Sequence, residues 1–292
     1  MLRDKRALFT GLSLFLAFCI SQAIAPVLAL VGEDVRLALY AVMELGGFWL
    51  AALLLQRGAA PTPISLRLKK RVRGTMPFVL LFSLMLSSLA ALLHYWTNRL
   101  MGTGEVPIDL PFSVTGWSLP VFLAVVLLPA AAEEVYLRGA LLSSLEDNHS
   151  NRAALLIAAL SSAMMRGSLV YLPGLLVLSL GLGYLVYSLD SLWPAIWGRV
   201  VYQLSCVAIS LISRAYSAFG IWNYFGVLAL VFSLLFGYFA LRLLQRQLEK
   251  GRINHWQSGE QNALAAVLQT VLSPGFLAFV LAFISKAVLR LW

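Results

Sequence analysis

The chain has 292 residues, of which 60% are hydrophobic and only 12% are charged, and its mean hydropathy is +0.84. Soluble domains carry about 25% charged residues, so this composition excludes a soluble globular protein and predicts an all-α polytopic membrane protein. The net charge of +9 then favours basic loops beside anionic lipid over nucleic-acid binding. The two cysteines, Cys19 and Cys206, lie in apolar segments, so neither a disulfide framework nor a cysteine metal site is predicted.

The apolar stretches predict about eight or nine transmembrane helices, because a spanning helix needs about 20 predominantly apolar residues. The first stretch follows the charged start MLRDKR and lacks a small-residue cleavage site, so we expect a helix that is retained. Pro274-Gly275 interrupts the last stretch, which leaves spanning, re-entrant and surface topologies open. The stretches are 7–30, 35–56, 76–96, 117–145, 152–170, 172–189, 192–212, 219–244 and 262–291.

Two basic loops indicate the orientation of the chain in its membrane. Residues 57–74 carry six Lys or Arg and no acid, and residues 241–254 also carry an excess of Lys and Arg. The positive-inside bias places both loops, together with the N-terminus, on the cytoplasmic side. We therefore expect a multi-pass protein of a bacterial cytoplasmic (inner) membrane. It is divided into N-terminal helices (1–116), a core (117–210) and C-terminal helices (211–292).

Several ionisable side chains fall inside these apolar stretches. Each costs about 2.5–3.5 kcal/mol at the bilayer centre, so such residues are paired, face a polar cavity or have a function. They are Glu44, Glu133, Glu134, Arg138, Arg166 and Arg199.

The segment AAAEEVYLRGALL (130–142) concentrates three of these charges. Glu134 and Arg138 are four residues apart with the acid first, which favours an ion pair on one helix face. Glu133 is rotated by about 100° to a neighbouring face. The residues allow two interpretations: a self-neutralising pair with Glu133 bound to a distant arginine, or a glutamate that acts as a general base in a water-filled cavity. Pro129 just before the acids is expected to loosen the backbone there.

Three motifs in order resemble those of the CPBP family, which includes the type II CAAX prenyl endopeptidases. LPAAAEEVYLRG (128–139) resembles the first motif, EExxxR. LSSAMMRGSLVYLPG (160–174) is similar to the region that carries FxxxH before Leu-Pro. LGLGYLVYSLDSLWPAIWGRVVYQ (180–203) resembles the region that ends in HxxxN. The resemblance covers about residues 119–208 and implies a helical membrane-protease fold.

The resemblance also implies a set of site residues. In active members the motif glutamate is thought to activate water, while two histidines and an asparagine hold zinc or stabilise the reacting oxygen. The first motif carries over to Glu133, Glu134 and Arg138. The second-motif histidine falls at Val170, or at Leu169 if the register shifts by one. The third-motif histidine and asparagine fall at Arg199 and Gln203, so neither histidine is present.

The histidines that the chain does contain do not replace them at metal-ligand spacing. We expect His94, His149 and His255 to be surface or interface residues. Catalytic zinc usually has three ligands drawn from His, Cys and carboxylate. Arg199 keeps its charge and has no free lone pair, so it would repel a metal and attract Glu133 or Glu134. Arg166 would do the same if its side chain turned inward. We therefore expect no metal and no other cofactor.

The sequence thus favours a pseudoprotease that binds the lipid bilayer and a membrane-protein or cell-envelope partner. The main alternative is an intramembrane endopeptidase of the CAAX-protease type. In it, Glu133 or Glu134 serves as the general base, and Arg199 with Gln203 holds the developing oxyanion. A small transporter is a third possibility, although no repeat of helices or matched pair of broken segments supports it.

Overall fold

The computed structural model describes residues 2–58, 67, 74–102, 118, 120, 122–146, 150–215, 222–251, 253 and 263–289. Every regular element in these ranges is a helix, which confirms the predicted all-α class. The elements are α1 (Leu2–Ala29), α2 (Glu33–Gly58), α3 (Met76–Met101), η1 (Phe122–Leu127), α5 (Leu128–Glu134), η2 (Val135–Leu141), α6 (Leu142–Glu146), α7 (Asn151–Met164), α8 (Leu172–Leu189), α9 (Trp193–Ala215), α10 (Trp222–Glu249), α11 (Ala263–Val271) and α12 (Pro274–Leu289).

Six helices in the described ranges are long and apolar enough to cross a membrane: α1, α2, α3, α8, α9 and α10. Helices α7 and α12 are apolar but shorter. The predicted stretch 117–145 forms one run of helix from Phe122 to Glu146 in which α-helical and π-helical turns alternate. The predicted last stretch is divided into α11 and α12, and α12 begins at Pro274, where a proline is tolerated in the first turn. A polytopic membrane protein is therefore confirmed.

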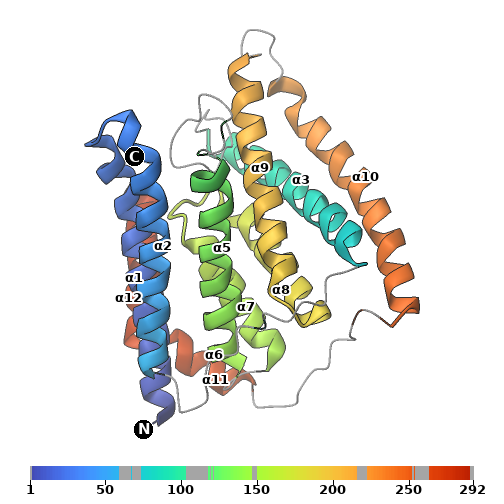
Figure 1. The fold of residues 1–292 in the computed structure, drawn as a ribbon. Coiled ribbons are helices and arrows are strands. Elements are labelled where there is room, and N and C mark those ends of the chain that lie inside the picture. The colour runs from blue at the N-terminus through green and yellow to red at the C-terminus, as the bar shows by residue number, and fades with distance from the viewer. Residues whose placement is uncertain are drawn as a thin grey trace.

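Helix α1 packs against α2 and against α12, so helices from the two ends of the chain lie together. Figure 1 shows α1 and α2 side by side at one edge of the molecule, with α12 along them. Helices α1 and α12 approach closely at Gly11 and Gly275, where a side chain on either glycine would collide with the backbone of the other helix. Phe18 of α1 then packs edge-on against Phe279 of α12, with ring centroids 5.7 Å apart. Small residues at such crossings are typical of helices packed within membranes.

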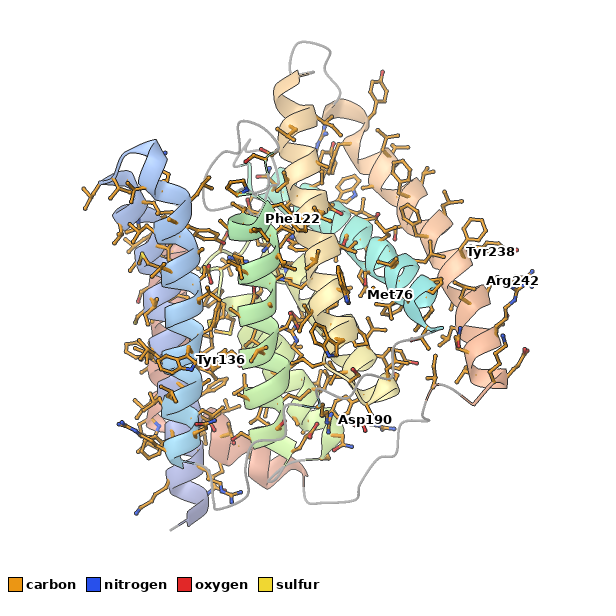
Figure 2. The ribbon with its side chains drawn as sticks, viewed as in Figure 1. Met76, Phe122, Tyr136, Asp190, Tyr238 and Arg242 are labelled. Atoms are coloured by element: carbon orange, nitrogen blue, oxygen red, sulfur yellow. The ribbon has the colours of Figure 1, made fainter. Side chains whose placement is uncertain are left out.

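A second group of helices lies on the other side of the central run 122–146 (Figure 1). Helix α3 packs against α8, α9 and α10, and its buried residues share one apolar cluster with those of α8 and α9. Helix α10 is the outermost of this group, and many of its large apolar side chains point outward, as expected for a surface in contact with lipid (Figure 2). The central run is thus covered on both sides, and Glu133, Glu134 and Arg138 within it are buried.

The central run departs from regular α-helix on both sides of the acids. The π-helical segments η1 and η2 flank α5, which contains Pro129, Glu133 and Glu134. Proline has no backbone N–H, so the helical bonding before it is disturbed, as the sequence indicated. Insertions of π-helical turns are frequent at functional sites because they re-aim side chains.

Candidate functional site

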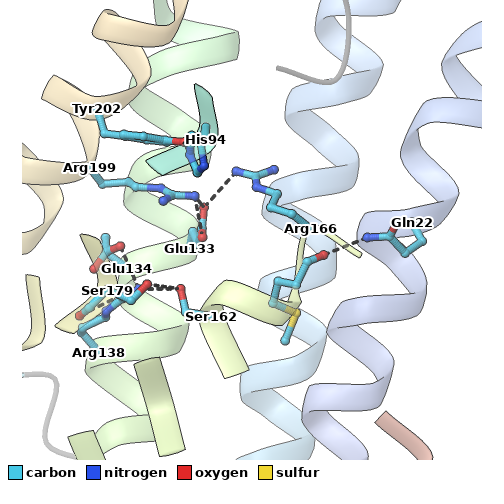
Figure 3. Close-up of polar contacts among 11 residues, drawn as sticks. Gln22, His94, Glu133, Glu134, Arg138, Ser162, Arg166, Ser179, Arg199 and Tyr202 are labelled. Atoms are coloured by element: carbon cyan, nitrogen blue, oxygen red, sulfur yellow. Dashed lines mark hydrogen bonds and ion pairs between the residues drawn. The ribbon is translucent and has the colours of Figure 1, made fainter. Parts of the chain in front are cut away.

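The carboxylate of Glu133 accepts hydrogen bonds from arginines of two other elements. Nη2 of Arg199, on α9, lies 2.7 Å from Oε1 and 2.6 Å from Oε2 of Glu133. Nη2 of Arg166, in the turn between α7 and α8, lies 3.4 Å from Oε2 (Figure 3). Glu133 and Arg199 are 4% and 1% exposed. Both oxygens of Glu133 are therefore engaged by a single buried guanidinium, and a second one supports them.

The neighbouring acid has a local partner instead. Nη1 of Arg138 lies 3.0 Å from Oε1 of Glu134, which is the predicted pair four residues apart. The same nitrogen donates to Oγ of Ser162 at 3.3 Å, and Nη2 donates to the carbonyl of Ser179 at 3.4 Å. The two serines are also joined, with Oγ of Ser179 2.9 Å from Oγ of Ser162. Arg138 thus ties the central run to α7 and α8.

The two pairs point to different neighbours because the acids are consecutive in α5. Successive residues of an α-helix are rotated by about 100°. Glu133 therefore meets α9 and the α7–α8 turn, while Glu134 stays with Arg138 on η2 (Figure 3). Within the described residues, Oε2 of Glu134 is buried without a hydrogen-bond partner. The site is thus two adjacent ion pairs in an apolar interior.

The turn that carries Arg166 is held by the terminal helices. Nε2 of Gln22, on α1, donates to the carbonyl of Met165 at 2.8 Å (Figure 3). The next residue after Arg166, Gly167, has a φ of +60°. A side chain there would meet Oε1 of Gln22 at 2.8 Å and Cγ of Lys286 of α12 at 3.0 Å. Both the positive φ and the lack of space therefore favour glycine. Sequence reasoning missed Gln22.

The prediction for His94 is wrong. This residue is 2% exposed, and its Nε2 lies 3.2 Å from the hydroxyl of Tyr202 on α9. Its ring also meets Tyr171 edge-on, with centroids 5.0 Å apart. Helix α8 makes room for the imidazole at Gly174, where any side chain would collide with it. The physical reason is that His94 follows Ala90 by one turn on the buried face of α3. His149 and His255 lie outside the described residues.

Tyr202 connects His94 to the ion pairs. Its ring lies 5.1 Å from Cζ of Arg199, within the range of a cation–π contact. A chain of contacts therefore runs from His94 of α3 through Tyr202 and Arg199 of α9 to Glu133 of α5 (Figure 3). Gln203, the remaining predicted site residue, is 2% exposed and lies one turn after Arg199. The small residues Ser83, Ser87, Ala90 and Ala91 of α3, which recur at helical spacing before His94, were the signal that could have placed His94 inward.

Comparison with known families identifies the segment that holds this site. Residues 115–205 match the family described as type II CAAX prenyl endopeptidase Rce1-like. This match supports the CPBP resemblance drawn from the three motifs. The match covers just under a third of the 292 residues and includes all three motif regions. Comparisons with curated proteins and with solved structures found no match.

The residues present do not fit the zinc that active CPBP members are expected to hold. The described part of the chain contains no group of three or more His, Cys, Asp or Glu placed to hold a metal ion. At the two positions where the resemblance places the family histidines, Val170 (or Leu169) offers no ligand atom and Arg199 offers a fixed positive charge. That charge is already bound to Glu133, the carboxylate that a metal would need. The arginines of this site instead neutralise the two buried acids, Glu133 and Glu134.

Proposed function

We propose that this CPBP-family membrane protein is a pseudoprotease that acts as a binding or scaffold partner of another membrane or cell-envelope protein. The observation that carries the proposal is Arg199, whose guanidinium binds both carboxylate oxygens of Glu133 at the position of a family histidine. A cation there replaces the charge of a metal without its Lewis acidity. The fold is kept while the hydrolytic chemistry is lost.

The geometry also argues against Glu133 as a base. A general base must direct a lone pair at the proton it takes, within about 2.6–3.2 Å of that group or through one water. In this site the oxygens of Glu133 face Arg199 at 2.6 and 2.7 Å, with Arg166 3.4 Å from one of them. Glu134 is fully buried and bound to Arg138. Both oxygens of Glu133 are therefore already engaged by arginine, which leaves neither directed at a water.

A buried network of this kind must have a reason to persist. Well-packed apolar residues are often as stabilising as a buried ion pair, so stability alone does not explain five charged residues in an apolar interior. The hypothesis is that they fix one relative arrangement of α5, α7, α8 and α9, and thereby the outer surface that a partner recognises. Loss of binding by a variant that stays folded but shifts these helices is the expected consequence.

The alternative function is a metal-free intramembrane endopeptidase. In it Glu133 activates water while Arg199 and Gln203 stabilise the oxyanion. The two functions differ in what Glu133→Gln does. In an enzyme this change abolishes cleavage of a peptide and leaves the fold intact. In a pseudoprotease it changes stability or partner binding, because it removes the anion between two arginines.

The decisive experiment is the metal content of detergent-purified protein, measured by mass spectrometry for the wild type and for Arg199→His/Val170→His. We expect a metal-free wild type and a double variant that gains zinc. A matched control, Arg242→His/Val227→His, puts the same substitutions on the exposed face of α10 and should gain none. A wild type with one zinc per chain and Glu133-dependent peptide cleavage would overturn the proposal.

We also infer residence in a cytoplasmic (inner) membrane with the N-terminus on the cytoplasmic side. The support is the Lys and Arg excess in the loops 57–74 and 241–254. The test is labelling of single introduced cysteines by a membrane-impermeant maleimide in intact cells, in a background without Cys19 and Cys206. Sites in the two basic loops should stay unlabelled until the cells are opened, and labelling before lysis would reverse the orientation.

A further inference from the structure

A second site, whose lining includes neither Glu133 nor Glu134 nor their arginines, lies between α3, α9 and α10. Here the structure contains a cavity of about 210 Å³. Figure 1 shows α9 and α10 leaning apart, with α3 packed against both. We call this cavity the α3–α9–α10 chamber, and it is lined by Ser87, Ser88, Ala91, Ser205, Ile209, Ile212, Phe225, Leu228, Ala229 and Phe232.

Small side chains on all three helices keep the chamber open. Ser87, Ser88 and Ala91 come from α3, Ser205 from α9 and Ala229 from α10. Between membrane helices such residues usually allow close packing. Here α9 and α10 each pack against α3 but make few direct contacts with each other in the described ranges, so the small residues leave a space of molecular size. An open space of this size sacrifices packing contacts, which favours an occupant that restores them.

The chamber is suited to hydrocarbon rather than to water. Each of its three hydroxyls already donates to its own helix: Ser87 to Ser83 at 2.8 Å, Ser88 to Leu84 at 2.9 Å and Ser205 to Val201 at 2.9 Å. The remaining lining is apolar. A water molecule needs two to four polar partners, and cavities without them stay dry and take apolar ligands.

One end of the chamber continues toward a cation. Phe225 of its lining meets the ring of Tyr95, with centroids 5.8 Å apart. The hydroxyl of Tyr95 in turn accepts a hydrogen bond of 2.9 Å from Nη1 of the exposed Arg99. Arg99 follows Ala91 by two turns of α3, about 12 Å along the axis. The neighbouring Trp96 is 53% exposed, as is typical of the membrane interface.

We propose that the α3–α9–α10 chamber binds a segment of one acyl chain of an anionic phospholipid, with the lipid phosphate at Arg99. The chamber would hold the acyl chain, the ring of Tyr95 would lie beside the glycerol, and Arg99 would meet the phosphate. The chamber residues of α9 recur at positions 205, 209 and 212, on a different face from Arg199 and Gln203. The site is therefore independent of the proposed function.

The experiment is native mass spectrometry of delipidated protein titrated with dioleoyl phosphatidylglycerol and, separately, with dioleoylglycerol. We expect one phosphatidylglycerol per chain to bind well above the background of weaker adducts, and dioleoylglycerol to bind at least about fivefold more weakly. Ser205→Leu fills the chamber and should weaken phosphatidylglycerol binding about tenfold, whereas Arg99→Gln should weaken it about fivefold.

The chain offers a matched control for each variant. Ser143→Leu changes a serine that also donates to its own helix, to Gly139 at 2.6 Å, outside the chamber. Arg242→Gln changes an exposed arginine that donates to Tyr238 four residues earlier, as Arg99 does to Tyr95. Both controls should bind phosphatidylglycerol like the wild type.

Three results would each overturn the proposal. The first is equal binding of the two lipids by the wild type, since the phosphate would then play no part. The second is wild-type binding in both Ser205→Leu and Arg99→Gln at unchanged melting temperature. The third is preferential retention of an isoprenyl alcohol over phosphatidylglycerol in a direct competition.

Discussion

The two ion pairs of the central run differ although their acids are adjacent. Glu134 is bound by Arg138 of the same run, at 3.0 Å. Arg138 also donates hydrogen bonds to the hydroxyl of Ser162 and to the carbonyl of Ser179. Glu133 is bound by Arg199 and Arg166, which come from α9 and from the α7–α8 turn. The first pair retains the residues of the family motif, while the second pair has an arginine in place of a family histidine. The Glu134–Arg138 pair is therefore local to one helical run, whereas the Glu133–Arg199 pair depends on how separate helices pack.

The largest effect is expected from breaking the local pair. Arg138→Leu leaves Glu134, which is 0% exposed, without its counterion, and it also removes donors from Ser162 and Ser179. Removal of one partner of a buried pair costs about 3–5 kcal/mol. We expect a fall of this size in the free energy of unfolding, measured by denaturant titration in detergent. Arg242→Leu, on the exposed face of α10, should change stability by less than about 1 kcal/mol.

A smaller effect is expected for the pair that differs from the family. Arg199→Leu should cost about 2–4 kcal/mol, at or below the value for Arg138, because Arg166 remains near Glu133. Adding Glu133→Gln should restore part of the loss, since the double variant no longer buries an unpaired carboxylate. A double-mutant cycle measures this coupling. Strict additivity of the two changes would contradict the pairing.

The contrast between the pairs also explains what could be predicted from the sequence. The pair of Glu134 and Arg138 follows from a spacing of four residues within one helix, and the motif order identified the family of residues 115–205. The partners of Glu133 depend on how α7, α8 and α9 pack against α5, which no local pattern encodes. The sequence gives candidates for such partners, and Arg199 and Arg166 were among them.

His94 and Gln22 were missed for a related reason. Both lie outside the family segment 115–205, and each reaches the site only through packing of α3 or α1 against it. A histidine beside Tyr95 and Trp96 is typical of an interface, so local composition outweighed the weaker helical periodicity that places it inward. The π-helical turns of η1 and η2 also have no simple periodic signature, although Pro129 indicated a disturbance near the acids.

The contact of His94 with Tyr202 should have a moderate effect. His94→Phe removes the hydrogen bond of 3.2 Å to the buried hydroxyl of Tyr202, at a cost of about 1–3 kcal/mol. Combining it with Tyr202→Phe should cost less than the sum of the single changes, because both remove the same bond. Unfolding of the four proteins of the cycle, followed by tryptophan fluorescence, tests this. A sum equal to the double variant would mean that the bond makes no contribution.

The smallest effect is expected for Gln22, which holds the turn that carries Arg166. Gln22→Met removes the hydrogen bond to the carbonyl of Met165 that holds the turn before Arg166, at a cost of about 1 kcal/mol. Gln247→Met is the matched control, since this glutamine also donates to a backbone carbonyl, that of Gly74 at 3.0 Å, and neither residue contacts Glu133 or Arg166. As single variants, Gln22→Met and Gln247→Met should lower the free energy of unfolding by similar amounts.

Only the coupling with Arg166 distinguishes them. If the terminal helices position Arg166 against Glu133, then Gln22→Met should lose part of its effect in an Arg166→Leu background, while Gln247→Met should add its full effect there. Equal coupling for both glutamines would show that α1 merely packs against the turn. Coupling confined to Gln22 would mean that α1, which lies outside the segment 115–205, helps to position Arg166 against Glu133.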